Sequence, residues 1–215
     1  MTDVPRVDMW YSLQSDYCYF LIDRLLKLSA AGVEVVIRPV LGLVLRMPEL
    51  TNDRPQIAQD YFAIDAAREA EFLGLPHVYP DPSPIQFEPG SFWIASKDQP
   101  RVERLFCLFV GATRAGQALP FLDKVVRHLW DGSQPGWDKS RFLYDALAGI
   151  GLDHDKLLAT NDWASVSSEL EANHHAMLDA GHWGVPLMVY EGEPFYGQDR
   201  FDQLLWRMGI KKDHD

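Results

Sequence analysis

The first forty residues constrain the fold most, because their periodicity changes twice. Between positions 7 and 13 every second residue is apolar, which is the pattern of a strand. From about position 16 the apolar residues recur at helical spacing, and Ala31-Gly32 ends that run. Alternation returns at 33–37 and stops at Pro39. A strand, a helix and a second strand in this order predict a right-handed, parallel βαβ unit, so the chain begins as an α/β fold.

The rest of the chain adds helices before it returns to strands. Prolines cluster between positions 76 and 89, and we expect no helix there. Helical spacing is found at 61–73, 100–116, 119–130, 140–148 and 163–180. Strand patterns return at 185–191 and 193–197, and a last helical pattern covers 200–208. The predicted order is therefore βαβ, a long helical block, then ββα.

Charge and cysteine content narrow the function classes. The chain has 20 basic and 31 acidic side chains, and its net charge of −11 argues against nucleic acid or an anionic membrane as partner. The N-terminal stretch MTDVPRVDMWY has no apolar signal region and no run of 18 apolar residues follows, so we expect a soluble, unexported protein. Cys18 and Cys107 are too few for a disulfide framework, which favours the reducing cytoplasm.

The strand-to-helix joint at 12–18, SLQSDYC, is a candidate for chemistry. Thiol-disulfide enzymes carry Cys-x-x-Cys at such a joint, whereas here Ser15 precedes Cys18. A helix N-terminus presents free N–H groups and the positive end of the dipole, which stabilise an anion such as a thiolate. The Ser15 hydroxyl could donate a hydrogen bond to a thiolate supplied by a small molecule. The alternative is that Ser15 or Asp16 only caps the helix.

Neither cysteine is expected to act in a redox pair. Cys18 lies one turn inside the helix, where cysteine is usually a small buried residue. Without a cysteine at position 15 it cannot form a short-range disulfide. Cys107 lies in the apolar stretch LFCLFV and is expected in the core. A lone reactive Cys18 is the redox alternative, and rapid labelling of the native thiol would support it.

Two motifs near the C-terminus could bind a ligand. Pro186 begins a strand, where a proline can be a simple edge feature; held cis, it would present the backbone N–H and C=O of Val185 to an extended ligand. Asp199 precedes the last helix and is expected to be its N-cap, with Asp202 resembling a capping box. The same carboxylate could bind an ammonium group with Gln198 as its neutral partner.

The remaining polar residues indicate no metal or phosphate chemistry. Asn52, Arg54 and Pro55 lie in a turn-rich loop, where such residues usually serve backbone geometry. The seven histidines include no pair with convincing metal-ligand spacing, so no metal site is expected. A Gly-rich phosphate loop and a Gly-x-Ser-x-Gly motif are both missing from the sequence.

The order of these motifs resembles a known family. Ser at the strand-to-helix turn, a helical block, Gly-Val-Pro and Tyr-Gly-Gln-Asp-Arg are similar to the DsbA-like thioredoxin-fold group, which contains kappa-class glutathione transferases and 2-hydroxychromene-2-carboxylate isomerase. The resemblance runs from Val7 to about Ile210. It implies an α/β, thioredoxin-like fold with a large all-helical insertion domain. The thioredoxin-like domain would comprise 1–45 and 181–215, and the insertion 46–180.

The resemblance also implies roles for individual residues. In that family a serine at the helix mouth hydrogen-bonds the sulfur of glutathione, and Ser15 is the match. A cis proline and the residue before it bind the cysteinyl backbone of the tripeptide, matching Pro186 and Val185. A polar residue and an aspartate hold its γ-glutamyl end, matching Gln198 and Asp199.

Other family positions match less directly. Asn52 is the match for an asparagine close to the ligand. A lysine that family members often carry before the residue matching Tyr61 is absent, since Ala-Gln-Asp stands at 58–60. The glutathione carboxylate would then be bound by Arg54 or by another basic residue. Asp16 replaces a family proline and adds a negative charge beside the proposed thiolate.

The resulting expectation is a glutathione-dependent isomerase of an aromatic acid similar to 2-hydroxychromene-2-carboxylate, acting as a homodimer. The alternatives are a kappa-like glutathione transferase, a DsbA-like oxidoreductase, and a non-catalytic thioredoxin-fold module that binds a peptide or mediates oligomerisation. Four basic residues are candidates for the substrate carboxylate: Arg38, Arg46, Arg54 and Lys97.

Overall fold

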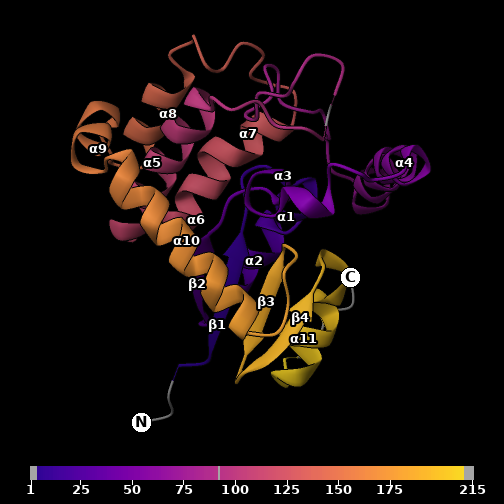
Figure 1. Ribbon diagram of the computed structural model, residues 1–215. Coiled ribbons are helices and arrows are strands. Elements are labelled where there is room, and N and C mark those ends of the chain that lie inside the picture. The colour runs from indigo at the N-terminus through magenta and orange to yellow at the C-terminus, as the bar shows by residue number, and fades with distance from the viewer. Residues whose placement is uncertain (1–3, 92, 211–215) are drawn as a thin grey trace.

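A four-stranded sheet with the strand order β2-β1-β3-β4 forms the centre of the molecule (Figure 1). The computed structural model describes residues 4–91 and 93–210. β1 (Arg6–Tyr11) pairs in parallel with β2 (Glu34–Pro39). β3 (Leu187–Tyr190) runs antiparallel to β1, and β4 (Glu193–Tyr196) antiparallel to β3. The predicted βαβ start and the ββα ending are therefore confirmed.

Helices connect and surround these strands. α1 (Asp16–Tyr19) and α2 (Ile22–Ala30) join β1 to β2, and α11 (Phe201–Arg207) follows β4. The helical block between β2 and β3 comprises α3 (Leu43–Arg46), α4 (Gln56–Leu73), α5 (Pro100–Arg114), α6 (Ala118–Phe121), α7 (Arg127–Trp130), α8 (Phe142–Gly149), α9 (His154–Thr160) and α10 (Trp163–Asp179). A π-helical turn, Leu122–Val126, links α6 to α7.

The helical predictions differ from the structure in three places. The single helix expected from position 16 is broken between α1 and α2. α4 begins at Gln56, five residues before the predicted start, directly after the turn formers of the loop. α3 and α9 were not predicted, because each is shorter than two full turns and gives little periodic signal. No helix forms in the proline cluster at 76–89, as expected.

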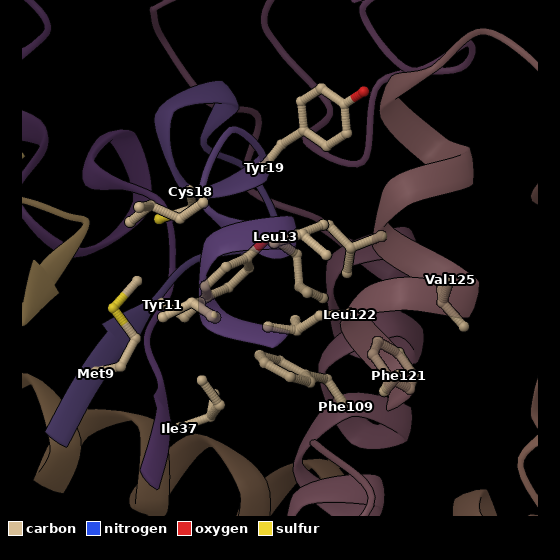
Figure 2. Close-up of a cluster of buried hydrophobic side chains, with 14 of the residues drawn as sticks. Met9, Tyr11, Leu13, Cys18, Tyr19, Ile37, Phe109, Phe121, Leu122 and Val125 are labelled. Carbon is tan, nitrogen blue, oxygen red and sulfur yellow. The ribbon is translucent and has the colours of Figure 1, made fainter. Parts of the chain in front are cut away.

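The two faces of β1 pack against different helices, which explains its alternating sequence. Val7, Met9 and Tyr11 are fully buried on the face toward α5 and α6, where the Tyr11 and Phe109 rings are 6.1 Å apart (Figure 2). Trp10 lies on the other face, and its Nε1 donates to the Asn173 carbonyl of α10 at 2.7 Å. Burying each such side chain contributes about 1.5–3 kcal/mol, so the pattern fixes β1 between two helical layers.

α4 lies at one side of the molecule, apart from the other helices of the block (Figure 1). Only Ala66 and Ala70 of this 18-residue helix are buried. Of the helices in residues 4–91 and 93–210, none is both long enough and apolar enough to span a membrane.

Candidate functional site

Ser15 is the N-cap of α1, at the carboxyl end of β1. Its backbone is extended, with φ −119° and ψ 119°, and its Oγ accepts a hydrogen bond from the Cys18 N–H at 3.3 Å. The Ser15 N–H donates to the Ser12 carbonyl at 3.3 Å and closes the turn. Because the oxygen accepts in the capping bond, the hydroxyl hydrogen can still donate. The capping interpretation is correct, and the capping bond does not use the hydroxyl hydrogen, which can be donated to the Cys18 thiol or to an anion.

Asp16 is almost completely buried beside this turn. Its Oδ1 accepts from the Tyr17 N–H at 2.9 Å, and the Tyr79 hydroxyl is 3.5 Å from its Oδ2. Burial is the main cause that raises the pKa of Asp16 to about 6, although these hydrogen bonds act in the opposite direction. Asp16 is therefore ionised at neutral pH at a cost in folding free energy, and its charge lies next to Ser15.

Cys18 is a packing residue. It is fully buried with Tyr11 and Leu13 (Figure 2). Burial raises the pKa of its thiol to about 12, and hydrogen bonds from the Ser12 backbone and the Ser15 side chain oppose this only in part. Cys107 is also buried and free. Neither thiol has the exposure or thiolate character of a reactive cysteine.

Val185 presents its backbone near the end of β1. The Val185–Pro186 bond is cis, in agreement with the family resemblance. Trp10 pairs with Leu187 in the last pair of β1 and β3, and Val185 lies two residues before Leu187, just beyond the end of this ladder. The Pro186 carbonyl accepts from the Gly197 N–H at 2.9 Å. Within the described residues the N–H and C=O of Val185 make no hydrogen bond, and both can pair with an extended ligand.

Gln198 is occupied by contacts within the protein. Its side-chain oxygen accepts from Arg24 of α2, and its nitrogen donates to Glu69 of α4 at 2.6 Å. The Gln198 carbonyl also accepts from Arg24 at 3.0 Å. Gln198 thus connects α2 and α4 at the start of the C-terminal helical segment.

Asp199 is not the N-cap of the last helix, contrary to expectation. Gly197 has a φ of 99° and leads into a 3₁₀ turn, Gln198–Arg200, so α11 begins only at Phe201. Asp199 lies within that turn, is exposed, and forms an ion pair with Arg200 at 3.0 Å. Its carboxylate therefore faces solvent at the edge of the site.

Arg54 approaches the site from the loop before α4, whereas Asn52 of that loop is exposed. The Arg54 guanidinium lies 4.8 Å from the centre of the Trp93 ring. Tyr196, at the end of β4, is close enough to α1 and to the loop before α4 for their charged or titratable groups to act on it. Desolvation raises the pKa of the Tyr196 hydroxyl, as does Cys18, while the charges of Arg54 and Arg46 oppose the shift. The site therefore draws residues from α1, the loop before α4, and β4.

Sequence reasoning did not identify Tyr196 and His182 as site residues. The two rings stack with centroids 3.8 Å apart. His182 Nδ1 accepts from the Gly184 N–H at 2.8 Å, and a Cβ on Gly184 would lie 2.4 Å from the Tyr196 ring. The sequence offers one signal for this contact, the glycine just before Val185. A glycine indicates that another group approaches the backbone closely, but it does not identify that group as the Tyr196 ring.

Two open surface hollows lie away from this site. One of about 430 Å³ is lined by α7 and α8 residues such as His128 and Phe142, and one of about 410 Å³ by residues near β1 and the β3–β4 turn. Neither includes Ser15 or Val185, so we define the site by its polar groups rather than by a preformed cavity. In the part of the chain that the structure describes, no cluster of three His, Cys, Asp or Glu could hold a metal ion.

Solved structures with the same fold include several enzymes. A 2-hydroxychromene-2-carboxylate isomerase has a TM-score of 0.68 and 21% identity, over 95% of this chain and 94% of that one. A probable DsbA oxidoreductase from Streptomyces coelicolor has a TM-score of 0.61 and 21% identity, over 98% and 93%. The cytosolic disulfide reductase DsbM from Pseudomonas aeruginosa, solved with GSH, has a TM-score of 0.56 and 14% identity, over 94% and 98%.

These likenesses establish the thioredoxin-like fold that the sequence predicts. No curated protein sequence matches the chain. The model of the family described as "DSBA-like thioredoxin domain" matches residues 6–209, almost the whole chain, and the chain therefore belongs to that family.

Proposed function

We propose that this protein binds glutathione and uses its thiolate to isomerise an aromatic acid similar to 2-hydroxychromene-2-carboxylate. The observation that carries the proposal is Ser15, which caps α1 while its hydroxyl can still donate. The chain supplies no thiolate of its own, because the pKa of the buried Cys18 is about 12. A thiol from a small molecule fits this arrangement. The likeness to a 2-hydroxychromene-2-carboxylate isomerase and to a DsbM solved with GSH supports it.

The backbone of Val185 would hold the tripeptide. Its unpaired N–H and C=O can pair with the cysteinyl unit in the manner of an added strand. The Trp10–Leu187 pair at the end of the ladder supports this, since Val185 follows beyond Leu187 and the Ser12–Ser15 turn follows beyond Trp10. A cysteinyl unit bound there would direct its sulfur toward the Ser15 hydroxyl. Arg54 and Asp199 would bind the charged ends of the tripeptide, with Asn52 beside them and Gln198 supporting the turn.

The reaction needs no redox change. The thiolate adds to a conjugated carbon of the substrate, a C–S bond forms, and the electrons of the double bond move to the conjugated carbonyl. Rotation about the new single bond follows, and expulsion of the thiolate restores the double bond. Ser15 stabilises the thiolate before addition and after expulsion. A site that lacks a cysteine pair can complete this cycle.

The Ser15→Ala variant tests the thiolate role. A hydrogen bond to a charged group is worth about 1.5–3 kcal/mol, so its loss should raise the pKa of bound glutathione by roughly one to two units. The ultraviolet absorbance of the thiolate, measured across a pH titration, reports this pKa. Ser167→Ala, at the surface of α10, is the control. Unchanged turnover with glutathione in Ser15→Ala would show that the serine does not stabilise the thiolate.

Simple measurements separate the alternatives. A transferase would give a product that retains glutathione in its mass, whereas the isomerase returns the thiol. An oxidoreductase would need Cys18 to react, which its burial opposes. A non-catalytic module would show no heat of binding with millimolar glutathione. The proposed location is the cytoplasm, where both free cysteines stay reduced.

The proposal includes a homodimer formed through α4. Ile57, Tyr61, Ile64, Arg68 and Phe72 recur every three or four residues on its outer face, and Ile57 and Phe72 are 79% and 82% exposed. A two-fold axis near Ile64 would pair two such helices antiparallel and place Tyr61 opposite the partner's Arg68, a favourable cation–π contact.

Ile64→Glu tests this dimer, with Ile94→Glu, an exposed isoleucine outside α4, as the control. Sedimentation should show a dimer for the control and a monomer for Ile64→Glu, because the introduced charge would be buried at the axis. A monomeric unmodified protein would refute the dimer.

A further inference from the structure

Arg46 is a partly buried cation without an ion-pair partner among the described residues. Its Nε donates to the Leu41 carbonyl at 2.9 Å, and its Nη1 has only a sulfur contact, 3.7 Å from Met47 Sδ. Its Nη2 is inaccessible to water and has no hydrogen-bond partner in the described part of the chain. A guanidinium removed from water is costly unless a carboxylate or several acceptors replace the lost hydration. The fold alone does not compensate this charge.

The surroundings of Arg46 are neutral and belong to the candidate site. Its charge influences Cys18 of α1, Tyr196 of β4, His174 of α10 and His182 of the loop before Val185. Burial raises the pKa of the thiol and of the phenol, and burial also lowers the pKa of both histidines. At neutral pH the four groups are therefore uncharged. Arg46 is a positive charge at the point where four elements meet, and Arg54 is a second cation that acts on Tyr196.

The acidic residues that act on the same neighbours do not pair with Arg46. Glu49 and Glu171 act on His174, where they oppose the effect of burial, and within the described residues no ion pair joins either of them to Arg46. Asp16 acts on Cys18 as well, where it raises the pKa that Arg46 lowers. In a chain of net charge −11, this unpaired guanidinium is a local exception. It has the features of a binding group whose partner is an external anion.

We propose that Arg46 binds the carboxylate of the acidic substrate beside the thiolate position at Ser15. The stacked rings of His182 and Tyr196 provide an aromatic surface for the rest of that ligand, since Tyr196 is 43% exposed. The inference rests on the proposed function for the class of acid, an aromatic carboxylate, and on the Arg46 geometry for the position. It assigns Arg46 to the substrate and leaves Arg54 to glutathione.

Calorimetric titration with trans-cinnamate and with its neutral analogue trans-cinnamamide tests this assignment. The unmodified protein should bind the carboxylate roughly ten to a hundred times more tightly than the amide, as expected for a charge-assisted pair. Arg46→Met should remove this preference and Arg46→Lys should keep part of it, because lysine retains the charge but loses the planar fork. Arg141→Met, at an exposed position of the chain, should leave it unchanged.

Thermal unfolding separates binding from a structural role. Arg46→Met should unfold at the same temperature as the unmodified protein or higher, because it removes a partly buried charge that has no ion-pair partner in the described chain. A clearly lower unfolding temperature, a failure to fold, or an undiminished preference for cinnamate would each overturn the assignment. Glutathione binding is measured in the same proteins: if it is absent while the preference for cinnamate depends on Arg46, the proposed function fails and the Arg46 site stands.

Discussion

Replacing Asp16 by asparagine should stabilise the protein at neutral and alkaline pH. Asp16 is 2% exposed and has no ion-pair partner among the described residues. Asparagine has nearly the same shape, so its Oδ1 can keep the bond from the Tyr17 N–H. Its amide can donate to the Tyr79 hydroxyl. The main change is the loss of a buried negative charge.

The expected gain follows from the pKa of Asp16, which burial raises from 3.8 to about 6. The folded protein holds this proton more tightly than the unfolded chain, so protonated Asp16 contributes stability that is lost as the pH rises through about 6. Roughly two pKa units correspond to about 3 kcal/mol at full ionisation. Weaker hydrogen bonding by the neutral amide offsets part of it. We expect a net gain of about 2 kcal/mol near pH 8 and almost none near pH 4.

Urea unfolding of both proteins at pH 4 and pH 8 measures this difference in the free energy of unfolding. The other acidic residues titrate alike in both proteins, so their contribution cancels when the two are compared at the same pH. At neutral pH the variant should also unfold about 4–8 °C higher, as expected for a chain of this size. A gain that is equal at pH 4 and pH 8 would refute the reasoning, because it would show that Asp16 does not titrate between them. A loss of stability at pH 8 would show that the charge itself is required by the fold.

Other residues give independent tests. At pH 8, Cys18 of the folded protein should react with iodoacetamide more slowly than Cys18 of the urea-unfolded chain, by a factor on the order of a thousand, because its pKa is about 12 in the folded protein. Mass spectrometry measures the labelling, and equal rates in the two states would contradict the burial of Cys18. Asp65→Asn should lower the free energy of unfolding by about 1 kcal/mol at neutral pH and by less in acid, since this carboxylate accepts from the Tyr17 hydroxyl at 2.5 Å and has a lowered pKa. Gly184→Ala should destabilise the protein by about 1–3 kcal/mol in thermal unfolding, because its Cβ meets the Tyr196 ring. Tyr196→Ala in the same chain should relieve most of this cost, and simple additivity of the two changes would contradict the clash.

The fold was predictable because its main signals are local. The alternation at 7–13 arises from β1 lying between two helical layers, and the change to helical spacing marks α1 and α2. The missed elements have weak local signals. α9 has seven residues and depends on Asp153, whose side chain accepts from the Lys156 N–H at 2.7 Å. The first turn of α4 was missed because turn-forming residues immediately precede it.

The candidate site was predictable only where its residues serve the local backbone. Ser15 could be located because strand, turn and helix are consecutive in the sequence. The capping role of Asp199 was predicted wrongly, because the positive φ of Gly197 starts a 3₁₀ turn that moves the helix start to Phe201. The partners of Gln198 lie 174 and 129 residues away along the chain, at Arg24 and Glu69, and no spacing rule reveals them.

Two charges that lower the stability of the folded protein act near Ser15. Asp16 is a buried carboxylate without a cation, and Arg46 is a partly buried guanidinium without an acid, and among the described residues the two do not form an ion pair with each other. Both influence Cys18, one turn from Ser15: Asp16 raises the pKa of this thiol and Arg46 lowers it. Under the proposed function the same two charges would act in opposite directions on a glutathione thiolate bound at the helix mouth. A scaffold selected for stability alone would have no use for either charge, and their shared location supports a functional role for the joint at Ser15.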